Sequence, residues 1–276
     1  MDKTAKELGN KTNDFFNSNS LVAKIAFILL VVFIFGIVLR LAISLIGNIF
    51  SYNSRTTKFF DGMVDAKQLL VYPQDPSTDG AKTINRSVNA TDGIEFTWSV
   101  WILVDDLTYN SGKYKCVFYK GNDGIQDTGL NFPNNAPGLY INPDTNAMTV
   151  MMNTFNVINQ MIVIPDIPLN KWFNVIIRCE NTTLDIYVNG TIIKSQMLHG
   201  VPKQNYGNVY VGMNGGFSGN ISNLWYYDYA LGIAEIQRIM QKGPNTKLLS
   251  SSFSSKNPNY LSLRWYFYGE KDEYNP

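Results

Sequence analysis

The sequence is poor in the residues that build metal centres and catalytic triads. It contains two cysteines, Cys116 and Cys179, and one histidine, His199, among 276 residues. Zinc sites need several Cys and His ligands close together, so this scarcity argues against a zinc protein. A Ser-His-Asp hydrolase would depend on His199, which stands in a loop-like stretch beside Gly200 and Pro202. We interpret His199 as a solvated loop residue.

Charge is scarce as well. Charged residues make up 16% of the chain, and the formal net charge is +1. Proteins that hold nucleic acids neutralise phosphates with stripes of Lys and Arg. The sequence has no such stripe, and we therefore expect no nucleic-acid partner.

Apolar residues, by contrast, gather in one long run. Residues 25–39 carry no charge, and the apolar character extends over 21–50. A helix needs roughly 20 apolar residues to cross a bilayer, so 21–50 is predicted to be a single transmembrane helix. Lys24 and Arg40 would lie near its two rims, with their charged ends pointing outward. Two alternatives stay open: a buried core helix, and a signal peptide cleaved near Ser44 or Ser51.

The helix predicts a lipid bilayer as a partner and a single-pass membrane location. Basic residues flank the run on both sides, so the orientation of the remaining chain stays open. We expect five segments: a polar tail (1–20), the transmembrane helix (21–50), a stalk and lead-in (51–82), a β-sandwich (83–245) and a C-terminal extension (246–276). The extension alternates over 261–268, which predicts a late strand.

Residues 169–194 show the alternation of a β-meander. One strand has an apolar side made of Phe173, Val175, Ile177 and Cys179, and the next has one made of Leu184, Ile186 and Val188. Asn189-Gly190 suits a type I′ hairpin turn, because both positions need positive φ. An apolar sheet face needs a second layer to cover it. Further patterns predict a strand over 83–88, a long loop over 121–138 and one short helix over 233–240.

Several motifs carry a family resemblance. They are KWFNV (171–175), LDIYVNG (184–190), FSGNISNLWYYDYAL (217–231) followed by Glu235-Ile236, and FTWSVW (96–101). Over 84–243 the chain resembles laminin-G-like domains of the concanavalin A-like lectin/glucanase superfamily. The resemblance implies a mainly β fold, a concanavalin A-like antiparallel β-sandwich (jelly roll), here preceded by a single transmembrane helix. The stretches 84–101 and 261–267 are most similar to membrane-anchored forms encoded by large DNA viruses of algae and protists.

The superfamily includes glycoside hydrolases, but this chain lacks their catalytic pattern. Those enzymes place paired carboxylates on one strand face through an E-x-D-x-E run. No such run occurs here, and Asp185 has Tyr187 as its second neighbour. We predict that the chain is not an enzyme and has no catalytic residues.

Loop residues provide candidates for binding. Asn122, Asp123 and Asp127 lie in the long loop and could supply oxygen ligands to calcium, although Asn-Asp-Gly also forms turns without metal. A glycan or partner site would combine loop polar groups with exposed aromatics. Its candidates are Asn122, Asp123, Tyr109, Trp225 and Tyr227, with surface or inter-sheet packing as the alternative. Tyr226 is expected to point inward, in register with Leu224.

Cys116 and Cys179 are both expected to face the core. They could form a disulfide or remain buried free thiols, which behave as small hydrophobes.

The function expected from these features is that of a non-enzymatic, membrane-anchored binding or structural protein. The resemblance to virus-encoded forms suggests a minor virion component that links an internal membrane to the capsid proteins of a large DNA virus. The alternative is a cell-surface glycan-binding lectin.

Overall fold

The structure is a computed structural model and describes residues 21–249. The predicted polar tail (1–20) and the predicted late strand (261–268) lie outside the described residues. The chain forms two compact units, which meet in the sequence between Thr56 and Thr57.

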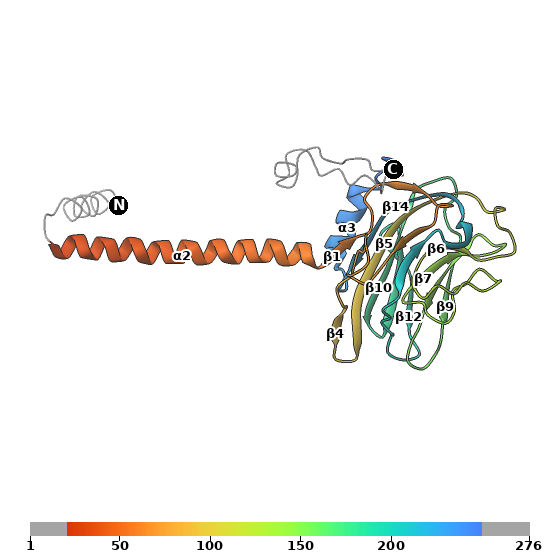
Figure 1. Cartoon of the computed structure of the whole chain (residues 1–276), viewed down its shortest axis with the longest axis horizontal. Helices are drawn as coiled ribbons and strands as arrows, with labels where there is room; N and C mark the ends of the chain where they lie inside the picture. The colour runs from red at the N-terminus through yellow and green to blue at the C-terminus, as the bar shows by residue number, and fades with distance from the viewer. Residues whose placement is uncertain (1–20, 250–276) are drawn as a thin grey trace, which may run out of the picture. The chain divides into compact units, whose positions relative to one another are not determined.

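The first unit contains one long helix, α2 (Leu21–Ser54), of 34 residues (Figure 1). Its segment Lys24–Leu45 is long and apolar enough to cross a membrane, and no part of the apolar window is buried. At 1.5 Å per residue, these 22 residues span about 33 Å, which matches a hydrocarbon core of about 30 Å. The predicted apolar helix is therefore present, and the alternative of a buried core helix is wrong.

The second unit is built from two sheets that stack as layers (Figure 1). The strands of the first, sheet A, are β1 (Thr56–Lys58), β2 (Met63–Asp65), β4 (Val88–Ala90), β5 (Gly93–Asp106), β10 (Phe173–Asn181), β11 (Thr183–Val188), β12 (Thr191–Met197) and β14 (Ser218–Tyr227). They follow the order β1-β14-β5-β10-β11-β12, with β2 paired to β14 and β4 paired to β5.

The strands of the second, sheet B, are β3 (Leu70–Tyr72), β6 (Lys115–Gly121), β7 (Gly138–Ile141), β8 (Ala147–Met152), β9 (Gln160–Pro165) and β13 (Asn208–Val211). Their order is β3-β13-β6-β7-β8-β9. The ladders among β2 to β14 are antiparallel. The predicted antiparallel β-sandwich is confirmed, and the predicted long loop separates β6 from β7.

Two segments near the start of the sandwich differ from expectation. The stalk predicted over 51–82 supplies β1 and β2 to sheet A and β3 to sheet B, so these short strands belong to the sandwich. The strand predicted over 83–88 is wrong, because only Val88 of that stretch lies in a strand, at the start of β4.

The main hydrophobic core lies between the sheets. Predicted inward residues of β10 and β11 that belong to it are Phe173, Val175, Ile177, Cys179, Leu184 and Ile186. The turn that follows β11 has φ of 51° at Asn189 and 76° at Gly190, as a type I′ hairpin requires. Both predictions are confirmed.

The expected position of Cys116 is wrong. The ladder between β6 and β7 shifts register between Cys116 and Phe118, and such a bulge interrupts the alternation of side chains. Val117 and Phe118 both join the main core, while Cys116 joins a separate cluster with Tyr119 and Tyr140. Cys116 therefore lies on the outer side of sheet B, away from Cys179.

One short helix covers the outer side of sheet A. Besides the 3-10 turn η1 (Met213–Gly215), the second unit contains α3 (Ile233–Lys242). Its buried residues Ile236 and Ile239 pack with Ile176 and Trp225 of the sheet. The helix ends at Gly243, where φ is 68° and the N–H donates to the carbonyl of Ile239. The predicted short helix is confirmed.

Candidate functional site

A cleft with a volume of about 640 Å³ opens between the two sheets. Sheet A lines it with residues of β4, β5 and β14, and sheet B lines it with residues of β6 and β8. Ligand sites are typically concave, mostly apolar spaces of about 300–1,000 Å³ that carry a few polar groups. The size of this cleft falls within that range.

The floor of the cleft is apolar and comes from both sheets. Ile94, Phe96 and Trp98 of β5, Met152 of β8 and Tyr226 of β14 line it. All five are otherwise buried in the main core. The cleft therefore opens where the two layers of the sandwich part and leave core side chains facing a cavity.

One wall is the segment 84–87, which was predicted to be a strand. The N–H of Ile84 donates to Oε1 of Gln74 at 3.0 Å, and the Tyr226 hydroxyl donates to the carbonyl of Asn85 at 3.1 Å. These bonds explain the failed strand prediction, because side chains satisfy backbone groups that a neighbouring strand would otherwise pair. The same bonds hold this wall beside the floor.

The rim is polar and mainly basic. The charged residues that line the cleft are Arg86, Lys120, Lys203 and Asp75. Two of the aromatic side chains that line the cleft are largely exposed: Tyr206 is 96% exposed and Phe155 is 68% exposed. The Lys203 ammonium lies over the Phe155 ring, 5.1 Å from its centroid.

Lys120 is the most unusual group of the site because it is buried. It is 5% exposed, and its ammonium donates to the carbonyls of Asn205 and Gly207 and to Oδ1 of Asn205. Among residues 21–249, no carboxylate lies within ion-pair distance of Nζ. Burial lowers the pKa of Lys120 to about 8.

None of the five predicted glycan or partner residues lines this cleft. Trp225 and Tyr227 were expected to be exposed, and this is wrong: they are 8% and 6% exposed and lie under α3. A ring covered by a helix offers no free face to a sugar. Tyr226 points into the main core beside Leu224, as predicted.

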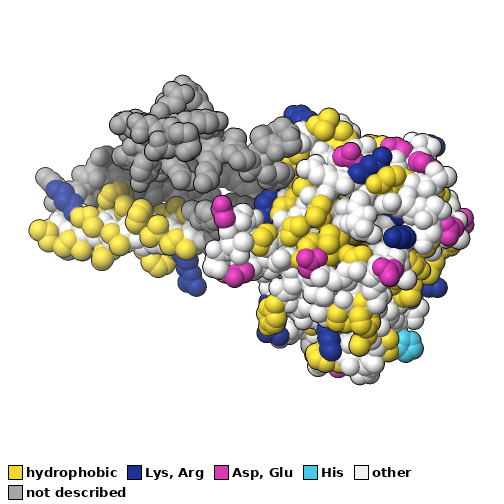
Figure 2. All heavy atoms as spheres, turned by 45° about the vertical axis from the view of Figure 1, so that its right-hand side comes forward, with side chains coloured by type: hydrophobic (Ala, Val, Ile, Leu, Met, Phe, Trp, Pro, Cys, Tyr) yellow, Lys and Arg dark blue, Asp and Glu magenta, His cyan; other side chains and the backbone are white. Residues whose placement is uncertain are grey.

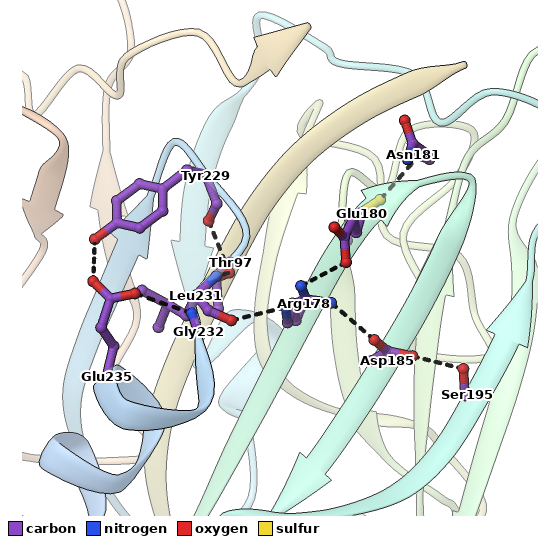
Figure 3. Close-up of polar contacts among 11 residues, drawn as sticks. Thr97, Arg178, Glu180, Asn181, Asp185, Ser195, Tyr229, Leu231, Gly232 and Glu235 are labelled. Carbon is purple, nitrogen blue, oxygen red and sulfur yellow. Dashed lines mark hydrogen bonds and ion pairs between the residues drawn. The ribbon is translucent and has the colours of Figure 1, made fainter. Parts of the chain in front are cut away.

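A polar network fixes the segment that leads into α3 (Figure 3). Arg178 of β10 donates to the Leu231 carbonyl at 2.9 Å and to Asp185 at 3.0 Å, and it also pairs with Glu180. Nearby, the Thr97 hydroxyl donates to the Tyr229 carbonyl and accepts from the Leu231 N–H. These bonds hold the helix over Trp225 and Tyr227.

The three loop candidates for calcium differ in their exposure and hydrogen bonds. Asp123 and Asp127 are exposed, and the Asn122 amide donates to the Phe132 carbonyl at 3.3 Å. The described residues contain no group of three or more His, Cys, Asp or Glu side chains that could hold a metal ion. The carbonyl oxygen of the Asn122 side chain is buried without a hydrogen-bond partner. Calcium at Asn122, Asp123 and Asp127 stays a prediction.

The remaining candidates lie apart from the cleft. Tyr109 is half-buried beneath the Lys67 ammonium, which is 4.6 Å from the ring centroid. Lys24 and Arg40 are exposed on α2, and their placement at membrane rims stays a prediction. His199 is exposed in a loop, in agreement with its interpretation as a solvated residue.

Cys116 and Cys179 are free and buried. The disulfide is ruled out in this structure by the bulge, which places the thiols on opposite sides of sheet B. Burial raises the pKa of each thiol to about 12. The alternative of buried free thiols is therefore confirmed.

Sequence reasoning missed Arg86, Lys120, Lys203 and Tyr206. The one local signal was Lys120, a lysine in a strand whose other residues are largely apolar and aromatic. Arg86 lies in the loop before β4, and Lys203 and Tyr206 lie in the loop before β13; these two loops meet only in the folded chain.

Comparison with solved structures finds similar folds in toxin domains. The receptor binding domain of botulinum neurotoxin D is 13% identical, with a TM-score of 0.46, and the match covers 67% of this chain and 52% of that chain. The botulinum neurotoxin type G receptor binding domain is 14% identical, with a TM-score of 0.42, and the match covers 67% of this chain and 47% of that chain. The receptor binding domain of the botulinum neurotoxin C/D mosaic serotype is 14% identical, with a TM-score of 0.43, and the match covers 54% of this chain and 36% of that chain. The chain thus spans about a third to a half of these structures.

Comparison with curated proteins finds no match. The family model Laminin_G_3, described as the Concanavalin A-like lectin/glucanases superfamily, matches residues 75–237. This range covers more than half of the chain and contains β4 to β14, which include the strands that line the cleft and make up most of the sandwich. Together with the two antiparallel sheets, the match shows that the chain belongs to the concanavalin A-like lectin/glucanases superfamily.

Proposed function

We propose that this chain is a membrane-anchored, non-enzymatic binding protein that takes its ligand in the inter-sheet cleft. The observation that carries the proposal is the cleft itself, where side chains of both sheets form an apolar floor below a polar rim. Such a space binds by burying an apolar part of a ligand and orienting it through a few polar contacts.

The charged groups of the cleft favour binding over hydrolysis. A glycosidase needs two carboxyl groups about 5–9.5 Å apart, whereas Asp75 is the one carboxylate that lines the cleft among the described residues. The cleft residues that the structure describes therefore do not supply the carboxylate pair of a glycosidase, and we propose binding without hydrolysis.

A neutral fluorescent dye tests the binding proposal. The full chain in phosphatidylcholine nanodiscs is titrated with N-phenyl-1-naphthylamine, next to an Ile84→Trp variant whose larger side chain fills the cleft wall. Ile233→Trp is the matched control, because Ile233 is 73% exposed on α3 and lies outside the cleft. We expect saturable dye binding in wild type and Ile233→Trp that is lost in Ile84→Trp. Equal binding by all three would overturn the proposal.

The anchor is supported by the apolar length of Lys24–Leu45. We expect the full chain to stay with the membrane pellet after alkaline carbonate extraction. N-terminal sequencing of the extracted protein separates an anchor from a signal peptide, because cleavage near Ser44 or Ser51 would remove most of the helix. A soluble, shortened chain would contradict the anchor.

A narrower proposal places the protein in a virion. It would be a minor component that links an internal membrane to the capsid proteins of a large DNA virus, and its support is the sequence resemblance to virus-encoded forms. Purified virions should then contain the chain in a constant ratio to capsid protein. Its absence from virions, with copurification on virus-free host membranes, would sink this proposal.

A cell-surface glycan-binding lectin is the second candidate. The observation that favours it is Tyr206, an aromatic ring 96% exposed at the cleft lining, since exposed rings can stack on sugar faces. A glycan array probed with wild type and Tyr206→Ala tests it. We expect a defined set of positive glycans that weakens in the variant, and a flat array would reject the lectin.

A further inference from the structure

We infer that the ligand of the inter-sheet cleft is a small amphipathic anion, such as a fatty-acid carboxylate. Its apolar body would lie on the floor and its anionic group beside Lys120. This inference rests on the proposed binding function and names the class of ligand.

The floor selects for an apolar body. Of the five floor residues, Ile94, Phe96 and Met152 offer only carbon and sulfur surface, and the Tyr226 hydroxyl already donates to the Asn85 carbonyl. A sugar placed on this floor would bury hydroxyl groups without partners, which costs free energy for each group left unpaired. An alkyl or aromatic body has no such groups and gains from leaving water.

The rim selects for an anion. Arg86, Lys120 and Lys203 line the cleft against a single acidic residue, Asp75. An apolar body that carries a negative group therefore matches the floor and the rim at once.

Lys120 makes this charge preference specific. Its ammonium is buried, and its hydrogen-bond partners are all neutral oxygens of Asn205 and Gly207. Neutral oxygens satisfy the N–H groups but do not cancel the charge, and a buried charge is costly until an opposite charge pairs with it. An anion entering the cleft supplies that missing charge.

A second buried lysine on the same strand shows the contrast. Lys115 is 1% exposed, and its ammonium donates to the carbonyls of Asn142 and Pro143. Unlike Lys120, it lies in the field of Asp106 and Asp144, and it does not line the cleft. Lys115 is thus a matched control for a buried lysine that needs no external anion.

Two dyes that differ by one sulfonate test the inference. The full chain in phosphatidylcholine nanodiscs is titrated with neutral N-phenyl-1-naphthylamine and with anionic 8-anilino-1-naphthalenesulfonate, and binding to Ile84→Trp in the same discs is subtracted. We expect the anionic dye to bind at least about tenfold more tightly, since pairing a buried charge with an opposite charge contributes at least about that much. Lys120→Met should reduce the ratio of the two affinities several-fold, and Lys115→Met should leave it unchanged.

Further measurements keep the inference testable if Lys120→Met fails to fold. They also distinguish a free fatty acid from a lipid as the source of the anion. Arg86→Gln changes an exposed side chain and should lower the ratio by a smaller factor. In wild type, dodecanoate should displace the anionic dye at a concentration about tenfold lower than dodecanol needs. Displacement in discs that contain phosphatidylglycerol supports the same chemistry supplied by a lipid.

The outcomes separate the two proposals. Tight binding of the neutral dye with no preference for the anionic dye would overturn the inference and leave the binding function intact. No cleft-dependent binding of either dye would overturn both. Displacement by dodecanol and dodecanoate alike would show an apolar site without charge selection and would also overturn the inference.

Discussion

The two sides of strand β14 lead to opposite outcomes. Trp225 and Tyr227 point to the outer side of sheet A, where α3 covers them, while Tyr226 points inward and lines the cleft. The sequence marks the covered pair as the better binding candidates, and the structure opens the other side. An aromatic residue becomes available for binding only where no neighbouring element covers it.

The two regions also treat their cations differently. Under α3, Arg178 pairs with Glu180 and Asp185 and donates to the Leu231 carbonyl. In the cleft, Lys120 has only neutral oxygen partners. The cation under α3 therefore has carboxylate partners within the protein. The Lys120 ammonium gains an oppositely charged partner only when an anion binds in the cleft.

One face of the sandwich carries charges of both signs. On the face that Figure 2 shows, Lys and Arg side chains are interspersed with Asp and Glu side chains. This mixture fits the small net charge of the whole sequence and the expectation that no nucleic acid is bound.

We expect the largest difference between the two regions when one aromatic ring is removed from each and the free energy of unfolding is compared. Trp225→Ala should lower the free energy of unfolding by about 3–5 kcal/mol, because a buried aromatic is lost beneath α3. Tyr206→Ala should change it by less than about 0.5 kcal/mol, because that ring is exposed. Urea unfolding of both variants measures the difference. A Trp225→Ala cost below about 1 kcal/mol would show that α3 does not depend on this contact.

The network that holds α3 should give the next largest effect. Arg178→Ala should cost about 2–3 kcal/mol, because it leaves the buried Asp185 without its cationic partner and the Leu231 carbonyl without its side-chain donor. Glu180→Gln is the control, with an expected cost below about 1 kcal/mol, because its side chain is 49% exposed. Equal costs for the two variants, measured by urea unfolding, would contradict a special role of the Leu231 contact.

Lys120 should give a smaller effect that depends on pH. Its folded pKa of about 8 lies below the ordinary value of 10.5. Between these values the unfolded chain binds more protons than the folded chain, so this group makes stability rise with pH. From pH 7 to pH 9, wild type should gain about 1 kcal/mol relative to Lys120→Met.

Urea unfolding of the two proteins at both pH values measures this gain. Titration of the cysteines and tyrosines contributes to both proteins and cancels in the difference. A difference that does not change with pH would mean that the folded pKa of Lys120 is ordinary.

The sequence by itself determined the features that depend on neighbouring residues. The period-two pattern of 173–188 and the positive-φ turn at Asn189-Gly190 predicted strands that the structure confirms. The charge-free run 25–39 predicted the apolar helix, and the motifs of 171–236 indicated the superfamily. These features need only local geometry or a contiguous pattern, so they can be recognised before the fold is known.

Only the tertiary structure decided which of these residues meet and which are covered. The bulge in β6 moved Cys116 out of the core, because an extra residue in a strand is set by its pairing with β7 and leaves no mark in the local pattern. The burial of Trp225 depends on α3, which follows it in the chain, and the cleft depends on loops from four connections, β3–β4, β6–β7, β8–β9 and β12–β13. Both the covering of Trp225 by a helix and the meeting of distant loops at the cleft depend on long-range packing. The alternation of residues within a single strand does not encode such packing.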